Sequence, residues 1–310
     1  MILLLTVPLL VPFALGPLAR RCLDRLTPVA ALWSVTLALV VLAGASVAAL
    51  GAFVLTGLLK VPLLAGLGDL VHPLRTASDL VVLPAAAAAT GALTVGAWTV
   101  VRSAVRQLRA FRTARSQADR RPAAGDLCVI ESPHPDAYAL PGRPHRIVVT
   151  TAMLRSLGAD EREALFAHER AHNAGGHHRF LVVAELAAHC HPGLRTVRAT
   201  VALAAERAAD EAAALAVGDR RLIARAITRA ALATGEARRE RPGFAPAATT
   251  GPVPQRVAAL LAAAPRHRPR AAALAALLLA VCAAVSAGAS GAGVVSFHHE
   301  VEVAQGEEAR

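Results

Sequence analysis

Residues 168–172 read His168-Glu169-Arg170-Ala171-His172, and this H-E-x-x-H stretch decides how the fold of the whole chain is interpreted. Positions i and i+4 lie on one face of a helix, so both imidazoles can reach a single metal ion. Zinc accepts neutral histidine nitrogens, and a glutamate beside the metal can take a proton from the attacking water. The stretch therefore predicts a zinc site in which Glu169 acts as the catalytic base for hydrolysis of an amide bond.

The neighbouring residues indicate that the motif lies on a short helix. Residues 160–163 read D-E-R-E, which has the D-x-x-E form of a capping box and predicts a helix start near Glu161. Gly175 and Gly176 predict a helix end just after the second histidine. An amphipathic helix that carries two histidines by chance is the alternative, and this readable start and stop make it less favoured.

The composition is typical of a membrane protein. Hydrophobic residues make up 55% of the chain and aromatic residues only 3%. The apolar content is therefore mainly alanine, leucine and valine, which suit long helices better than a β-sandwich. The 4 cysteines are scattered without a C-x-x-C pair, so neither a disulfide framework nor a cysteine-based zinc site is expected.

Four apolar segments are long enough to cross a bilayer, which takes about 20 residues. They cover approximately residues 1–19, 29–59, 80–101 and 271–295. The third and fourth segments are rich in alanine, and a buried or interfacial helix is the alternative for them. The chain is thus predicted to be mainly α, with four transmembrane helices and with residues 102–270 as a separate domain between the third and fourth spans.

The distribution of charge predicts the orientation of these spans. Arginines follow the first and third segments and precede the fourth, whereas the tail at residues 296–310 is acidic. We therefore expect a multi-pass protein of the cell membrane with both termini outside and residues 102–270 in the cytoplasm. Most of the net charge of +11 belongs to these flanking arginines. No nucleic-acid partner is expected, because no nucleic-acid-binding motif accompanies them.

A small sheet is predicted ahead of the zinc helix. Its three candidate strands are residues 127–130, 137–140 and 146–150. Thr150 or Thr151 can cap the helix that follows. Such a sheet offers an edge to which an extended peptide can add as a strand, and Ala137, Tyr138 and Ala139 are the candidate substrate edge. Tyr138 could also be a transition-state donor, although a role in packing or at the substrate edge is favoured.

A zinc peptidase needs a third protein ligand and keeps the fourth position for water. Glu206 lies on a later predicted helix, and Asp210 follows one turn on, where it can hold a ligand histidine through the second ring nitrogen. Glu185 and Glu211 are competing carboxylates. Glu185 follows His172 so closely that little chain is left to turn back toward the metal. We therefore favour Glu206.

Two further histidine clusters have a simpler interpretation. His177-His178 and His189-Cys190-His191 have the composition of metal sites. Both lie beside glycine or proline at predicted helix ends, where histidine is common as a cap or interfacial residue. We therefore expect one zinc ion per chain and no second metal site.

Four segments of this sequence resemble the BlaR/MecR-type integral-membrane zinc metallopeptidases. They are H-E-R-A-H after its D-x-x-E helix start, the E-x-x-x-D of residues 206–210, A-Y-A-L-P-G at 137–142 and R-V-A-A-L-L at 256–261. The wider group is similar to the HtpX and CAAX-prenyl-protease type of membrane peptidase. The resemblance covers approximately residues 1–297 and is strongest between 126 and 215.

The resemblance implies a fold and a set of site residues. The fold is a cytoplasmic, zincin-like α+β peptidase domain between spans three and four. The residues are the zinc ligands His168, His172 and Glu206, the catalytic Glu169 and the supporting Asp210. Antibiotic-sensing members carry an extracellular sensor after the last span, whereas only residues 296–310 follow it here. Direct sensing of β-lactams is therefore not expected.

These features predict a membrane-embedded, zinc-dependent endopeptidase that cleaves a cytoplasmic or membrane-proximal protein. A transcriptional repressor is the substrate that the resemblance implies. One alternative is a zinc-binding signalling scaffold that does not cleave, but a scaffold has no chemical need for Glu169. Another is a transporter with a fortuitous motif, which should carry polar residues within its spans. Substrate, activating signal and oligomeric state stay open.

Overall fold

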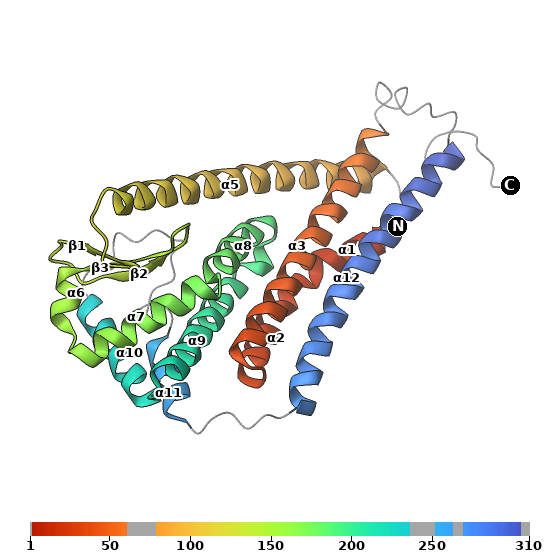
Figure 1. The fold of residues 1–310 in the computed structure, drawn as a ribbon. Coiled ribbons are helices and arrows are strands. Elements are labelled where there is room, and N and C mark those ends of the chain that lie inside the picture. Colours follow the sequence, from red (N-terminus) through yellow and green to blue (C-terminus); the bar gives the residue numbers. More distant parts are fainter. Residues whose placement is uncertain (1, 61–78, 236–251, 263–268, 305–310) are drawn as a thin grey trace.

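The computed structural model describes residues 2–60, 79–235, 252–262 and 269–304. The described chain is mainly helical and contains one three-stranded sheet. The sheet lies at one end of the molecule, and the long apolar helices lie at the other (Figure 1). This arrangement agrees with the prediction of a mainly α chain with a small sheet ahead of the zinc helix.

The first apolar segment forms two helices instead of the single span expected for residues 1–19. α1 (Ile2–Leu10) and α2 (Pro12–Arg25) meet at a bend of 44°. Proline has no N–H to donate, so Pro12 leaves the carbonyl of Pro8 without its helical partner. Ser46 on α3 (Pro28–Leu58) donates to that carbonyl at 2.9 Å. The bend is therefore stabilised by a contact from the neighbouring helix.

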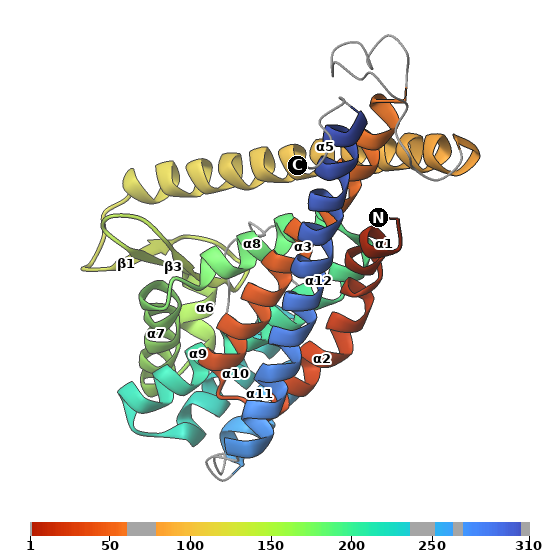
Figure 2. The ribbon, with the colours of Figure 1, turned by 90° about the vertical axis from the view of Figure 1, so that its right-hand side faces the viewer.

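Within the described residues, three helices are long and apolar enough to cross a membrane, or four if the bent pair counts as one span. α3 matches the predicted second span, and α12 (Pro269–Ala304) contains the predicted fourth. These two helices run side by side (Figure 2). α12 continues through most of the predicted acidic tail, and residues 305–310 lie outside the described residues.

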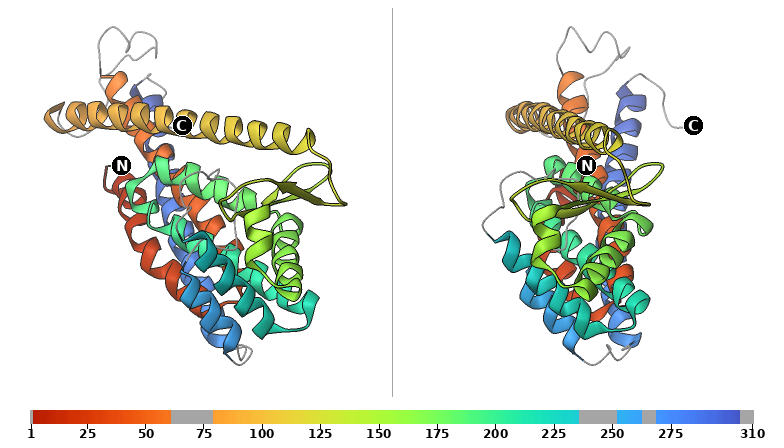
Figure 3. Two further views of the ribbon diagram at one scale, coloured as in Figure 1. Left: turned by 90° about the vertical axis from the view of Figure 1, so that its left-hand side faces the viewer. Right: turned by 60° about the vertical axis from the view of Figure 1, so that its left-hand side comes forward.

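The third apolar segment does not run alongside these two helices. It is continuous with the basic residues after it, and together they form α5 (Asp79–Asp119), one helix of 41 residues. α5 crosses α3 instead of running parallel to it (Figures 1, 2 and 3). Gly57 permits the closest approach, because a Cβ there would lie 2.2 Å from the Cβ of Ala86. Residues 80–119 are still one of the three candidate spans by length and composition, so the predicted third span stays a prediction.

The three predicted strands are confirmed at the residues expected. The sheet has the order β1-β3-β2, where β1 is Leu127–Ile130, β2 is Ala137–Leu140 and β3 is Arg146–Thr150. β1 pairs with β3 in parallel, and β2 pairs with β3 antiparallel. Thr150 caps α6 (Thr151–Ser156) by accepting from the Met153 amide at 3.3 Å, as predicted.

The two faces of the sheet are covered by different helices. Alternate side chains of a strand point to opposite faces. On one face, Leu140 and Tyr138 pack with Ala114 and Ala118 of α5. On the other face, Ala137 packs with Leu165 of the zinc helix. Tyr138 therefore points away from that helix, which supports the packing role and not the role of transition-state donor.

The zinc helix is α7 (Ala159–Ala174). Its start differs from the prediction, because Gly158 is the N-cap residue and Glu161 accepts from its amide at 3.0 Å. The capping carboxylate is thus Glu161 and not Glu163, since the helix starts two residues earlier than D-x-x-E suggested. The predicted stop is confirmed, with Gly175 as the C-cap residue.

The remaining helices join the two ends of the molecule. They are α8 (His177–Cys190), the short 3-10 helix η2 (Pro192–Leu194), α9 (Val197–Val217), α10 (Arg220–Thr234) and α11 (Val253–Leu261). Buried side chains of α8 and α9 share one hydrophobic core with α2, α3 and α12. The segment that carries α8 and α9 is thus packed directly against the apolar helices.

Candidate metal centre

Two helices bring the three predicted ligands together. α7 presents His168 and His172 on its buried face, with 3.0 Å between their Nε2 atoms. Glu206 of α9 places Oε2 at 3.5 Å from Nε2 of His168 and Oε1 at 3.6 Å from Nε2 of His172. Among the described residues, these three form the group whose ligand atoms all lie within 4.8 Å of one another. Each side chain is about 1% exposed.

The chemistry of this donor set fits a catalytic zinc ion. Two neutral imidazole nitrogens and one carboxylate make three protein ligands, and zinc then keeps a fourth position for water or substrate. Glu169 follows His168 on the same helix and is fully buried. The arrangement thus combines a three-ligand metal site with a carboxylate that can accept a proton beside it.

Asp210 lies beside His168, where it is positioned for the supporting role expected of it. Its Oδ1 lies 3.0 Å from Nδ1 of His168, on the side of the ring away from the other ligands. A carboxylate at this nitrogen fixes the tautomer and orientation of a metal-binding histidine, so that Nε2 keeps its lone pair for the metal. Asp210 and Glu206 stand one turn apart on α9, and both are buried.

Arg256 of α11 was not predicted to belong to the site, yet it binds both of these carboxylates. Its Nε and Nη2 donate to Asp210 at 2.8 and 2.6 Å, and its Nη1 lies 2.9 Å from Oε2 of Glu206. The side chain is 0% exposed. The sequence held one signal for this role. Arg256 is the lone charge in the apolar stretch of α11, and a buried cation requires a counter-charge.

The charges of the site stabilise one another. Burial alone would raise the pKa of Glu206 and Asp210, but Arg256 and the histidines more than offset it and hold both values below their usual range. Burial alone would lower the pKa of His168, but Asp210 and Glu206 raise it to about 9 in the metal-free site, so a metal ion must displace a proton from this ring to bind. Both carboxylates are therefore ionised at neutral pH and available as acceptors or ligands.

His177 also belongs to the site, and the expectation that it caps a helix is wrong. Its Nδ1 lies 2.8 Å from Nδ1 of His172. Burial, followed by the nearby His172, lowers the pKa of His177 to about 3, so the ring stays neutral. A neutral His177 can accept from His172, which leaves Nε2 of His172 free to face the metal. Gly175 permits this contact, because a Cβ there would lie 2.4 Å from Nε2 of His177.

The other candidate ligands have different partners. Glu185 pairs with Arg198 and His189, and Glu211 pairs with Arg220. His191 accepts from the Gly193 amide at 3.2 Å, which is the capping role predicted for it. Both competing carboxylates therefore lie outside the metal centre, and Glu206 is the one that the fold brings to the histidines.

Comparison with known proteins identifies the segment that contains the histidines. Residues 105–191 match the family model described as Peptidase family M48, and this match ends before Glu206. Protease HtpX of Idiomarina loihiensis is 41% identical over 73 residues. That match covers 21% of this chain and 24% of the relative, so the chain spans about a quarter of the relative's length. No solved structure matches the chain.

Proposed function

We propose that this chain is a zinc-dependent endopeptidase of the membrane, because residues 105–191 match the model of Peptidase family M48 and a stretch of 73 residues is similar to Protease HtpX. One observation carries the proposal. The side chains of His168, His172 and Glu206 converge beside a fully buried Glu169, on helices that pack against apolar membrane-type helices. A scaffold or a transporter has no use for this combination of ligands and base.

Each residue of the site has a chemical task in this reaction. Zinc bound by the three ligands would supply a Lewis acid that polarises the peptide carbonyl and lowers the pKa of water. Glu169 accepts the proton of the attacking water and passes it to the leaving amine. Asp210 and His177 hold the two imidazoles in place through their second ring nitrogens. Arg256 keeps Glu206 and Asp210 ionised and oriented.

We propose the β2 edge as the place where an extended substrate binds. β2 lies at the end of the described sheet, beside α7, so its outer side can pair with an added strand. Ala137 and Ala139 are buried and small, which permits a peptide backbone to come close. Tyr138 points to the other face and would contribute its backbone. Because Glu169 is fully buried, substrate binding requires a movement that exposes it.

The substrate proposed is a cytoplasmic or membrane-proximal protein, with a transcriptional repressor as the specific candidate. Proteomic comparison of cells that carry the wild type or Glu169→Gln tests this directly. A cleaved protein should appear in wild-type cells alone. Equal fragment patterns in the two strains would contradict the proposal that this chain cleaves a cellular protein.

The requirement for metal is tested on the full chain reconstituted in lipid vesicles, with the substrate found by proteomics. Dialysis against a zinc chelator should abolish cleavage, and stoichiometric zinc should restore it. Cleavage that persists in chelator, with no zinc in the preparation, would contradict the proposed metal centre.

We also propose, from the distribution of arginines, that residues 102–270 face the cytoplasm and that both termini lie outside. Labelling of Arg120→Cys with a membrane-impermeant thiol reagent tests this, in a chain whose 4 native cysteines are replaced by alanine. The new cysteine should react only after the cells are permeabilised. Labelling in intact cells would reverse the orientation.

A further inference from the structure

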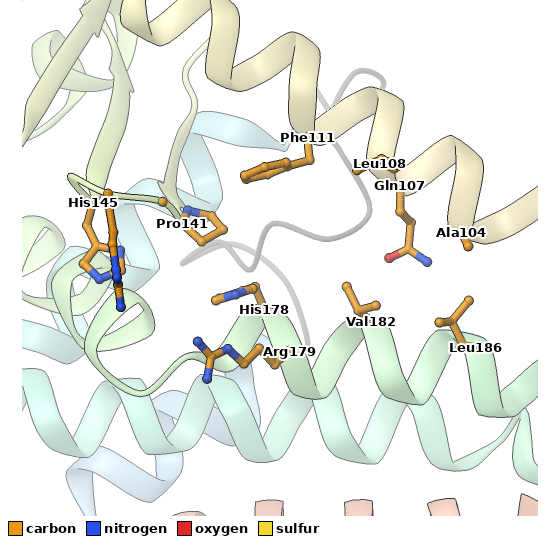
Figure 4. A pocket seen from close by; sticks show the side chains of 12 residues that line it. Ala104, Gln107, Leu108, Phe111, Pro141, His145, His178, Arg179, Val182 and Leu186 are labelled. Carbon is orange, nitrogen blue, oxygen red and sulfur yellow. The ribbon is translucent and has the colours of Figure 1, made fainter.

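A cavity of about 570 Å³ lies between α5, α8 and the turn that joins β2 to β3 (Figure 4). Its volume is within the range of about 300–1,000 Å³ that is usual for small-molecule sites. None of the described residues that line it belongs to the metal centre. The α5 side of the sheet therefore carries a concave site outside the metal centre.

The two ends of the cavity differ in polarity. Ala104 and Leu108 of α5 face Val182 and Leu186 of α8 at one end (Figure 4). Basic side chains gather at the other end, toward the sheet. They are Arg143, His145, His178 and Arg179. A ligand that fills both ends must be apolar along most of its length and anionic at one tip.

The basic end is held in place by the fold. Arg115 of α5 donates through Nη1 to the carbonyl of Pro144 at 2.7 Å, which ties the β2–β3 turn to the helix. Gly142 has a φ of +147°, and a Cβ there would lie 2.5 Å from the same Nη1. The turn therefore packs directly under the guanidinium, which holds the backbone that carries Arg143 and His145 against α5.

The basic end of the cavity has an electropositive environment. Burial, together with the charges of Arg179 and His145, lowers the pKa of His178. The anion preference of this end therefore rests on the basic side chains that line it, Arg143, His145 and Arg179. A phosphate has the charge and the acceptor oxygens to bind several such donors at once.

The apolar end opens toward the membrane-type part of α5. Exposed apolar side chains continue along this helix from the cavity toward residue 80. Val95, Trp98 and Val101 are 63%, 66% and 57% exposed, and Leu108 in the cavity wall is 47% exposed. An acyl chain can thus extend from the cavity along these apolar side chains of α5, past Gln107, which also lines this end.

We propose that this cavity binds one anionic phospholipid, with its phosphate among Arg143, His145 and Arg179 and one acyl chain between Leu108, Val182 and Leu186. The continuous apolar stripe on α5 favours a lipid over an acidic peptide, whose polar backbone would gain nothing from it. The basic end favours an anionic headgroup over a zwitterionic one.

Native mass spectrometry of the full chain, delipidated in detergent, tests the proposal. The chain is titrated with dioleoyl phosphatidylglycerol or dioleoyl phosphatidylcholine. One phosphatidylglycerol should bind at least about tenfold more tightly than phosphatidylcholine, because the choline cation of phosphatidylcholine cancels the charge of its phosphate and is repelled by the basic end. Arg143→Glu combined with Arg179→Glu should remove this preference. Equal binding of both lipids by the wild type would overturn the proposal.

Arg109→Glu is the matched control. Arg109 is an exposed arginine of α5 that does not line the cavity, so its reversal changes net charge without touching the site. It should leave the preference for phosphatidylglycerol intact. If Arg109→Glu lost the preference to the same extent, general attraction of the anionic lipid to the basic surface would explain the binding, and the proposal would be overturned.

A second variant tests whether an acyl chain occupies the apolar end of the cavity. Zinc binding by the same variant shows whether the chain is still correctly folded. Val182→Trp should weaken phosphatidylglycerol binding by about tenfold while the chain still binds one zinc ion. Competition with a soluble polyglutamate peptide completes the design. Displacement of the lipid from the wild type by this peptide, at equal affinity, would replace the lipid with an acidic protein segment and overturn the proposal.

Discussion

Helix α7 carries charged residues on two faces, and the two faces differ in what surrounds them. On the buried face, His168, Glu169 and His172 are at most 1% exposed and belong to the network of the metal centre. On the outer face, Arg170 donates to both oxygens of Asp126 at 2.7 and 3.0 Å, with side chains 52% and 35% exposed. The outer pair has two hydrogen bonds of nearly the same lengths as the pair between Arg256 and Asp210.

The difference between these faces lies in solvation. Water screens the outer pair, and exposed ion pairs contribute about 0–1 kcal/mol to stability. A buried pair is not screened, so loss of one partner leaves an uncompensated charge and costs about 3–5 kcal/mol. Similar contacts on the two faces should therefore respond very differently to substitution, and the metal centre should depend on the buried face alone.

The largest effect is expected for Arg256→Ala. The change leaves Glu206 and Asp210 as buried carboxylates without their cation, which should lower the free energy of unfolding of the metal-free chain by about 3–5 kcal/mol. Denaturant unfolding in detergent measures this loss. Arg256→Lys is the control, because it keeps the charge and loses only the two-pronged contact with Asp210. Equal stability of Arg256→Ala and wild type would contradict the buried network.

A smaller effect on metal binding is expected for Asp210→Asn. The amide is neutral and holds His168 less firmly, which should weaken zinc binding by about 10- to 100-fold. Competition with a fluorescent chelator measures the affinity. Glu211→Gln serves as the control, since Glu211 is the next residue on α9 and pairs with Arg220 instead. Equal zinc affinity of Asp210→Asn and wild type would remove Asp210 from the site.

His177→Ala tests the support of the other imidazole. A neutral histidine is a weaker acceptor than a carboxylate, so we expect zinc affinity to fall by about tenfold, at the lower end of effects from such supporting residues. His177→Asn keeps an acceptor and should recover part of the affinity. His178→Ala is the control, because His178 faces the cavity beside α5. An identical loss in both alanine variants would point to a distorted α8 and not to the contact with His172.

The smallest effect is expected for Arg170→Ala on the outer face. Unfolding free energy should fall by no more than about 1 kcal/mol, and zinc affinity should not change. The hydrogen bond from Arg170 holds the pKa of Asp126 below its usual range. The contribution of the pair is therefore present above the unfolded value of about 4 and is lost as pH falls through the lower folded value. A loss as large as that of Arg256→Ala would show that solvation does not separate the two faces.

Local signals predicted much of this fold. The three strands were found because short apolar runs alternate with proline, glycine and aspartate. The stop of α7 was found because two glycines follow the last periodic residue. The third ligand could be chosen because Glu206 and Asp210 share one face of a helix. Each of these signals lies within a few residues of the feature that it predicts.

Features that depend on distant contacts were not predicted. Arg256 is 46 residues from Asp210 in the sequence, and only the packing of α11 on α9 brings them together. The contact between His177 and His172 depends on how α8 leaves the glycine turn. Composition identified α5 as apolar but could not predict that it crosses α3. Pro12 marks the bend between α1 and α2 in the sequence. The uninterrupted apolar run of residues 1–19 nevertheless favoured a single span in the prediction.

Measurement of zinc content and peptide cleavage on the same preparations of wild type and Glu169→Gln tests the proposed mechanism most directly. Glu169 is not a ligand, so the substitution should leave about one zinc per chain. Removal of the base should lower the cleavage rate by about 100-fold or more. Cleavage by Glu169→Gln at the wild-type rate, with zinc still bound, would contradict the role assigned to Glu169.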